Sequence, residues 1–203
     1  MLAHVLDAVR GAGIDEIFVV VGHRAELIKE YFANQPLTFV DQTEQRGTGH
    51  AVQQTEPYLM NLDVPILVVN GDVPLLRSST LRGLREKHEE SESAATVLSA
   101  LFPDPTGYGR IVRNGDSHFE KIVEDRDATD GERRISEINT GTFFFESRTL
   151  FPALREIRAD NAQQELYLTD VIHVLRRQGH RVAAHIAPAW EEVRGVNTLS
   201  ELQ

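Results

Sequence analysis

The amino-acid sequence predicts an α/β protein built on a doubly wound, mostly parallel sheet with helices on both faces. Three observations predict this fold. Short β-branched and aromatic runs alternate with segments of helical period, the early strands are apolar throughout, and each strand runs into a glycine or a polar residue. The composition, 41% hydrophobic and 26% charged, is that of a globular protein, so we expect one domain spanning residues 1–203.

The N-terminal third reads as a helix followed by a β-α-β-α-β alternation. In the opening stretch Leu2, Val5, Leu6 and Val9 lie at helical spacing, before glycines that suit a helix end. Residues 17–21 form a continuous apolar run, which is typical of a strand buried on both faces. The expected order is helix 1–13, strand 17–21, helix 24–32, strand 37–40, helix 49–59 and strand 65–69.

The remaining two thirds of the chain have a more mixed pattern. Residues 128–134 are polar and acidic, and we interpret them as a solvated loop. The other expected elements are helix 79–88, strand 95–101, a glycine-rich turn at 105–109, a hairpin from 110 to 124, strand 140–146, helices 148–157 and 168–178, strand 182–186 and a short segment at 193–196.

Charge and composition exclude several classes of protein. Asp and Glu number 31 against 21 Lys and Arg, a net charge of −10, which argues against a broad nucleic-acid-binding face. Cysteine is absent, so disulfides, thiolate metal sites and a cysteine nucleophile are excluded. No apolar run approaches the ~20 residues that span a bilayer, and no signal peptide is evident. We expect a cytoplasmic protein without membrane insertion.

Asp72 is the first candidate site residue. Ligands of doubly wound sheets bind beyond the carboxyl ends of the strands, and Asp72 follows the buried strand 65–69 in the sequence VVNGDVPLL. A carboxylate there suits Mg²⁺, which typically binds one or two protein carboxylates together with substrate phosphates. Alternatively, Asp72 only makes an Asx turn before Pro74.

The loop DQTEQRGTGH, residues 41–50, is a second candidate because it joins a predicted strand to a predicted helix. Gly47 lets the backbone approach a flat ligand closely, and Gln42 offers the paired donor and acceptor that could read a nucleobase. The alternative is a helix-capping loop with Thr48 as the N-cap. His50 is interpreted as a packing histidine.

Other polar residues at the ends of predicted strands are ambiguous when each is considered alone. Gly109 in DPTGYGRI offers a free backbone N–H, and Glu124 and Asn139 could hydrogen-bond sugar hydroxyls or an acetamido group. Asn197 stands in GVN near the C-terminus. For each of them a turn or strand-end role is the alternative.

Taken together, these motifs occur in the order and approximate spacing of one family. EQRGTGHAVQQ, NGDVPLL, DPTGYGRI, IVEDRDAT, EINTG, NAQ, YLTD and GVN span essentially the whole chain. The sequence thereby resembles the uridyltransferase (pyrophosphorylase) domain of the bacterial bifunctional N-acetylglucosamine-1-phosphate uridyltransferases and glucosamine-1-phosphate acetyltransferases.

The resemblance implies a Rossmann-like nucleotidyltransferase fold with a small sugar-binding lobe. It implies the synthesis of UDP-N-acetylglucosamine and pyrophosphate from UTP and N-acetylglucosamine 1-phosphate, with Mg²⁺, for peptidoglycan precursors of the cell wall. Matched to the family motifs, Asp72 and Asn197 become magnesium ligands and Gln42 reads the uracil. Gly47, Thr48 and Gly71 then lie at the nucleotide. Gly109, Glu124, Asn139, Tyr167 and Thr169 match positions around the sugar.

The sequence departs from the family pattern in three places. The family begins with a strand and a glycine-rich loop, LAAGxGTRM, followed by a lysine in PK, and neither motif occurs here. Asn70 replaces the usual tyrosine of YGDVPL, and NAQQELYLTD differs from NAQGEYYLTD. Because the glycine-rich loop neutralises the triphosphate in the family, we expect these 203 residues to be an N-terminally truncated uridyltransferase domain with little activity alone.

Further implications concern the parts of the family that this sequence does not match. No hexapeptide repeat of a left-handed β-helix is found, so we expect no acetyltransferase activity. The family allows a homo-oligomer in full-length members. The alternative function is a catalytically silent remnant that binds a nucleotide sugar or a partner, and a close relative with another base or sugar preference is a further alternative.

Overall fold

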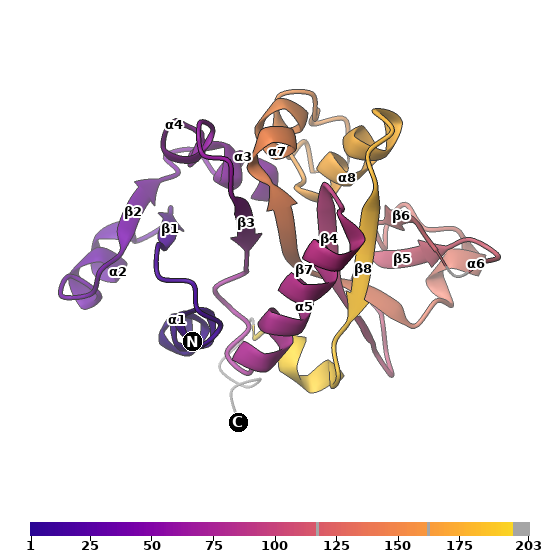
Figure 1. Cartoon of the computed structure of the whole chain (residues 1–203), viewed down its shortest axis with the longest axis horizontal. Helices are drawn as coiled ribbons and strands as arrows, with labels where there is room; N and C mark the ends of the chain where they lie inside the picture. The colour runs from indigo at the N-terminus through magenta and orange to yellow at the C-terminus, as the bar shows by residue number, and fades with distance from the viewer. Residues whose placement is uncertain (117, 162, 197–203) are drawn as a thin grey trace.

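The computed structural model describes residues 1–116, 118–161 and 163–196, and its centre is a six-stranded mixed sheet (Figure 1). The strand order is β6-β5-β7-β4-β8, and β3 also pairs with β7. Its strands are β3 (Pro65–Val68), β4 (Ala95–Leu101), β5 (Arg110–Arg113), β6 (Phe119–Val123), β7 (Glu137–Glu146) and β8 (Val182–Ile186).

The sheet is mixed because the long strand β7 runs antiparallel to all its neighbours. β3, β4 and β5 each pair with it in antiparallel register, and β5 and β6 form an antiparallel pair. Only β4 and β8 are parallel within this sheet. The α/β class is as predicted, but the expected parallel majority is not found among the described strand pairs.

A separate two-stranded sheet carries the first strands of the chain. β1 (Phe18–Val21) and β2 (Thr38–Asp41) pair in parallel, with Phe18 opposite Thr38, and α2 (Ala25–Tyr31) connects them. Figure 1 shows this unit to one side of the main sheet. Among the described residues, neither strand pairs with β3. The β-α-β-α-β order is therefore found along the chain, but its strands do not form one continuous sheet.

Two hydrophobic clusters cover the two faces of the main sheet, and β7 contributes to both of them. Phe143 and Phe145 belong to the first cluster, whereas Phe144 and Ile138 belong to the second. This division follows from the alternation of side chains along a strand. The part of β7 that contributes to both clusters here is therefore apolar at consecutive positions, as the sequence FFF at 143–145 shows.

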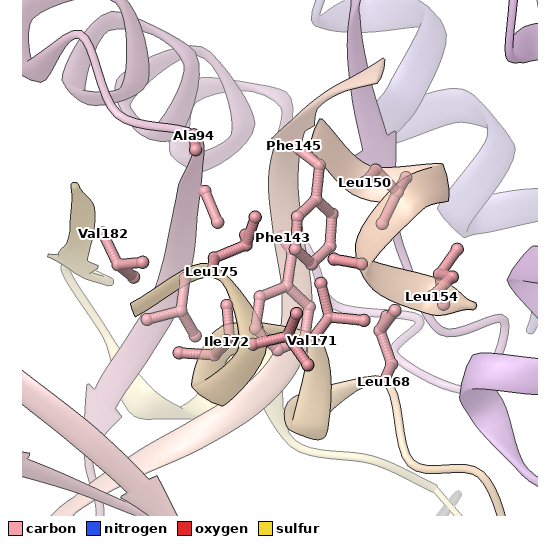
Figure 2. Close-up of a cluster of buried hydrophobic side chains, with 14 of the residues drawn as sticks. Ala94, Phe143, Phe145, Leu150, Leu154, Leu168, Val171, Ile172, Leu175 and Val182 are labelled. Carbon is pink, nitrogen blue, oxygen red and sulfur yellow. The ribbon is translucent and has the colours of Figure 1, made fainter. Parts of the chain in front are cut away.

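Helices pack on each face of the sheet through the apolar positions that helical periodicity predicts. The first cluster lies beneath α7 (Ser147–Leu154) and α8 (Thr169–Arg177). In Figure 2, Phe143 and Phe145 project from β7 towards side chains of α8 such as Val171 and Ile172. The second cluster takes side chains from α1 (Leu2–Gly11) and α5 (Ser78–Ser91).

Two expected elements differ from the observed ones for local reasons. The helix expected at 49–59 is two helices, α3 (Thr48–Gln53) and α4 (Glu56–Leu59), because Pro57 has no N–H to continue the first helix. A short helix, α6 (Asp130–Arg133), forms in the expected loop. There the Thr129 side chain accepts the Glu132 N–H, and the Glu132 carboxylate accepts the Thr129 N–H in return, which is a capping box.

The remaining boundaries differ by a few residues. β7 begins at Glu137 rather than at residue 140, and a 3₁₀ turn, η1 (Trp190–Val193), precedes the short C-terminal segment. In the part of the chain that the structure describes, no helix is long and apolar enough to cross a membrane.

Removing the Phe145 ring is expected to destabilise the fold strongly. Phe145 is 0% exposed between sheet and helices, and a buried Phe→Ala change typically costs about 3–5 kcal/mol. Leu27→Ala in α2 is the control, since Leu27 is 60% exposed and its loss should stay within about 0.5 kcal/mol. Equilibrium denaturant unfolding measures both changes, and equal losses would contradict the assignment of the core.

Candidate functional site

Strand register brings three of the predicted sugar-site residues together. Arg110 of β5 pairs with Val123 of β6 and with Ile138 of β7. Gly109, Glu124 and Asn139 each lie one residue beyond that pairing, and the Asn139 N–H donates to the Gly109 carbonyl over 2.7 Å. These residues stand far apart in the sequence, and the antiparallel strands place them side by side where β5 begins and β6 ends, next to Asn139 within β7.

Glu124 is the carboxylate of this group, and two neighbours hold it in place. The Thr169 hydroxyl, at the start of α8, donates to Glu124 Oε1 over 2.9 Å. A Cβ atom at Gly109 would lie 3.3 Å from Glu124 Oε2, so a side chain there would press on the carboxylate. The structure thus gathers Gly109, Glu124, Asn139 and Thr169, four of the five residues predicted around the sugar.

Burial raises the pKa of Glu124 above its ordinary value, and the negative charges of Asp170 and Asp127 raise it further. The hydrogen bond from Thr169 and the nearby His173 act in the opposite direction. The pKa of Asp170 is also raised, again mainly by burial. Partly buried carboxylates gathered in this way are typical of functional sites, where groups are held in electrostatically unfavourable places.

Glu124 and Thr169 also line an open cavity of about 900 Å³. Tyr167, the fifth predicted sugar-site residue, lines the same cavity and donates its hydroxyl to the Gln163 side chain. Burial raises the pKa of Tyr167. The cavity extends along α8 past His173, with Arg155, Arg158 and Arg177 among its lining residues.

The predicted nucleotide loop is joined to the sugar-site segment by backbone pairing. The Leu166 N–H donates to the Arg46 carbonyl over 2.8 Å, and the Gly49 N–H donates to the Leu166 carbonyl over 2.7 Å. Gly47 has φ +103°, and a Cβ there would lie 2.6 Å from the Leu166 carbonyl oxygen. The close approach therefore requires glycine at position 47.

Thr48 takes part in the same pairing rather than capping the helix. α3 begins at Thr48 with Gly47 as its N-cap residue, and the Thr48 hydroxyl accepts the Leu168 N–H over 3.0 Å. The N-cap alternative for Thr48 is therefore wrong. Because Leu168 lies between Tyr167 and Thr169, this bond ties the nucleotide loop to two of the predicted sugar-site residues.

Gln42 is buried at the end of β2, and its amide is held by its own loop. Its Nε2 donates to the Gly47 carbonyl over 3.1 Å and lies 3.0 Å from His50 Nδ1. His50 is thus a packing partner of Gln42, in line with its interpretation from the sequence. The predicted reading of a uracil by Gln42 stays a prediction.

Asp72 follows Gly71 in the turn after β3, and its backbone meets the C-terminal segment. The Val196 N–H donates to the Asp72 carbonyl over 2.9 Å. Residues 190–193 of that segment are anchored to α5, because the buried Glu192 accepts the Thr80 hydroxyl over 2.5 Å and lies 3.5 Å from Arg77. Asn197, the second predicted metal ligand, lies outside the described residues.

The role of Asp72 as a magnesium ligand stays a prediction, and its side chain is accessible enough to allow it. Its side chain is half-exposed, and within the described ranges its carboxylate accepts no hydrogen bond, so the Asx-turn alternative finds no support. Mg²⁺ binds one or two protein carboxylates and keeps water and substrate oxygens as its further ligands, so a carboxylate without a hydrogen bond is compatible with the role predicted for Asp72. No cluster of three or more His, Asp or Glu side chains suited to a metal is found among the described residues.

Some residues that shape the site were not found from the sequence. Asn70 packs against Gly141, where a Cβ would lie 2.5 Å from Asn70 Nδ2 and φ is +77°. In the sequence, Asn70 stands out only because it replaces the tyrosine of the family motif, and nothing there indicates its contact with Gly141. Glu192 and Arg110 were overlooked because a charged residue in a single sequence gives no sign of whether it is buried.

The sequence profile of the nucleotidyl transferase family matches residues 1–202. Curated relatives include the bifunctional protein GlmU of Geobacillus thermodenitrificans, 48% identical over 197 residues, and that of Lactococcus lactis, 48% identical over 199 residues. Each alignment covers 97% of this chain and 43% of the relative. The chain therefore spans less than half the length of the curated relatives it matches.

A solved structure with a similar fold is the UDP-glucose pyrophosphorylase complexed with UDP-glucose. It superposes with a TM-score of 0.75 over 95% of this chain and 81% of that chain, at 15% sequence identity. The likeness confirms the predicted class of fold and, at that identity, says nothing about the ligand of this chain.

Replacing Glu124 by glutamine is expected to stabilise the fold at neutral pH. A carboxyl whose pKa is raised by folding costs stability as the pH rises from its unfolded pKa through its folded pKa. The gain of Glu124→Gln over wild type should be largest near pH 7 to 8 and should shrink towards about pH 4, where unfolded glutamate protonates.

Thermal unfolding between these pH values measures the difference, with Glu120→Gln at an exposed position of β6 as the control. A gain that does not depend on pH, or one shared by the control, would contradict the electrostatic account of Glu124.

Proposed function

Since the chain belongs to the nucleotidyl transferase family, we propose that it is the uridyltransferase part of an enzyme that makes UDP-N-acetylglucosamine. The substrates would be UTP and N-acetylglucosamine 1-phosphate, and the products the nucleotide sugar and pyrophosphate. The reaction would supply cell-wall precursors in the cytoplasm.

One observation carries this proposal: Gly109, Glu124, Asn139 and Thr169 converge where β5 begins and β6 ends, and hydrogen bonds of residues 166–168 join the segment before Thr169 to the loop of Gln42, Gly47 and Thr48. A sugar site and a nucleotide site that share a wall are what the transfer of a nucleotide to a sugar phosphate requires. The 48% identity to bifunctional GlmU proteins over nearly all of this chain favours this activity over a catalytically silent remnant.

In the proposed reaction a phosphate oxygen of the sugar phosphate attacks the α-phosphorus of UTP, and pyrophosphate leaves in line. No protein nucleophile is needed, so the chain acts by positioning its substrates and by stabilising charge. Glu124, Asn139 and the Gly109 backbone would orient the sugar, and Gln42 with the Gly47 loop would hold the nucleotide. Asp72, with Asn197, would hold Mg²⁺, which when bound offsets the negative charge of the phosphates.

Asp72→Ala should remove most metal-dependent turnover in a version of the protein that also carries the glycine-rich loop LAAGxGTRM. Loss of a charge-stabilising group in a transition-state site typically costs about two to three decades in rate. The control is Asp63→Ala, since Asp63 is exposed and pairs with Arg148 at the surface. Pyrophosphate release measures turnover, and wild-type rates for Asp72→Ala at ordinary magnesium concentration would refute the metal assignment.

The 203-residue chain by itself is expected to turn over little or no substrate. UTP brings several negative charges to a chain of net charge −10. The glycine-rich motif that neutralises those charges in the family is not in this sequence. A version with that motif and its strand in front should gain at least about two decades in rate. It should also melt at a higher temperature, because β1 and β3, each paired with one strand among the described residues, would gain a partner on the other edge.

Side-by-side assays of pyrophosphate release and thermal unfolding compare the two proteins. Equal rates and equal midpoints would show that the glycine-rich loop is dispensable.

A further inference from the structure

Arg110 is a buried charge that the proposed reaction does not use. It is 2% exposed, although its side chain ends in a cationic guanidinium. Burying a charge is costly unless partners compensate for it, so its hydrogen bonds indicate what it does.

Its two shortest hydrogen bonds reach two separate segments beside the candidate site. Nη2 donates to Asp125 Oδ1 over 2.9 Å, and Nη1 donates to the Tyr108 carbonyl. Tyr108 precedes Gly109, and Asp125 follows Glu124. The planar fork of Arg110 therefore connects the immediate neighbours of two predicted sugar-site residues, and a weaker contact of 3.4 Å reaches the Arg133 carbonyl.

The backbone of Arg110 defines the same place in the sheet. It pairs with Val123 and with Ile138, so Gly109, Glu124 and Asn139 all lie one residue beyond it. Backbone pairing sets the register of the three strands at this point. The side chain then connects the two segments that continue from it, at Tyr108 and at Asp125, in addition to the backbone hydrogen bond between Asn139 and Gly109.

The energetics favour a role in geometry rather than in overall stability. An apolar side chain of similar volume is often as stabilising as a buried ion pair, or more so. Arg110 carries an extra cost, because its Nε is buried without a hydrogen-bond partner among the described residues.

Glu124 needs such a restraint. Burial and the nearby carboxylates of Asp170 and Asp127 disfavour its charged form, so an unrestrained loop would relax by turning Glu124 towards water. Arg110 holds the next residue, Asp125, and the Asp127 N–H donates to the Glu124 carbonyl over 3.0 Å. Together these contacts keep the segment 124–127 closed against the sheet.

We propose that Arg110 is a positioning residue for the sugar phosphate: through Tyr108 and Asp125 it fixes Gly109 and Glu124 in the orientation that binds the sugar. This inference rests on the proposed function for the identity of the ligand. The restraint on the two loops, by contrast, can be tested without any ligand.

The first experiment titrates the 203-residue chain with N-acetylglucosamine 1-phosphate and magnesium by calorimetry. Arg110→Lys keeps the charge but cannot reach both acceptors, and it should weaken binding at least about tenfold, since small displacements in a binding site are costly. Asp125→Asn keeps the side-chain shape and removes the charge of the partner. This variant should also weaken binding. The double variant should lose no more affinity than the single variant with the larger loss.

Arg113→Lys is the matched control. Arg113 lies on the same strand, is 26% exposed and forms its own fork with Glu137, with N···O distances of 2.7 and 2.6 Å. It is expected to lower the melting temperature without changing the affinity for the sugar phosphate. Equal losses of affinity in Arg110→Lys and Arg113→Lys, or none in either, would overturn the proposal. Should Arg110→Lys not fold, Asp125→Asn decides the question.

The second experiment measures amide hydrogen exchange without ligand. Arg110→Lys and Asp125→Asn should speed exchange at residues 124–127 and near Gly109, and Arg113→Lys should not. If exchange there stays at the wild-type rate, the positioning role is wrong. If Arg110→Lys and Asp125→Asn speed exchange as expected but the wild-type chain does not bind the sugar phosphate, the proposed function fails while the restraint by Arg110 stands.

Discussion

The pairing of β7 along both of its edges is the constraint on which the rest of the structure depends. β4 occupies one edge, and β3 and β5 share the other. Because side chains alternate, Phe143 and Phe145 serve one core and Phe144 the other. A slip of one residue would exchange these faces, so the two cores fix the register of β7 against its neighbours. That register also places Asn139 beside Gly109.

The two halves of the candidate site belong to different parts of the fold, and main-chain hydrogen bonds hold them together. Residues 46–49 follow the small β1–β2 sheet, whereas residues 166–168 lead into α8 on the main sheet. The contact at Gly47 is so close that a side chain would separate the two segments. Specificity for a ligand spanning both halves would therefore depend on backbone geometry as much as on the polar side chains.

Much of the fold could be predicted from local sequence patterns, because burial of a regular element leaves a period in the sequence. Leu2, Val5, Leu6 and Val9 predicted α1, and the apolar run at 65–69 predicted β3. Pairing between strands leaves no such record. The antiparallel course of β7 and the isolation of β1 and β2 from β3 depend on contacts far apart in the sequence, so local patterns could not reveal them.

The sequence offered candidates for the site residues, whose roles stay predictions, but not the residues that support them. Asp72, Glu124 and Asn139 could be selected as candidates because they stand near the ends of predicted strands and match family motifs. Arg110 and Glu192 look like ordinary surface charges in the sequence, and their burial is decided by the strands and helices that close over them. The capping box of Thr129 and Glu132 was readable in principle, but it was hidden by the acidic composition around it.

The sparse packing of α2, β1 and β2 has a consequence for how the molecule opens. α2 has no buried side chain, and each of the two strands has one, Val21 in β1 and Val40 in β2. Units with little buried apolar surface open at a lower free energy than the core and do so as cooperative pieces. The unit of β1, α2 and β2, which leads into Gln42, is thus expected to unfold locally while the main sheet stays intact. A nucleotide bound at Gln42 would stabilise the folded form of this unit by mass action.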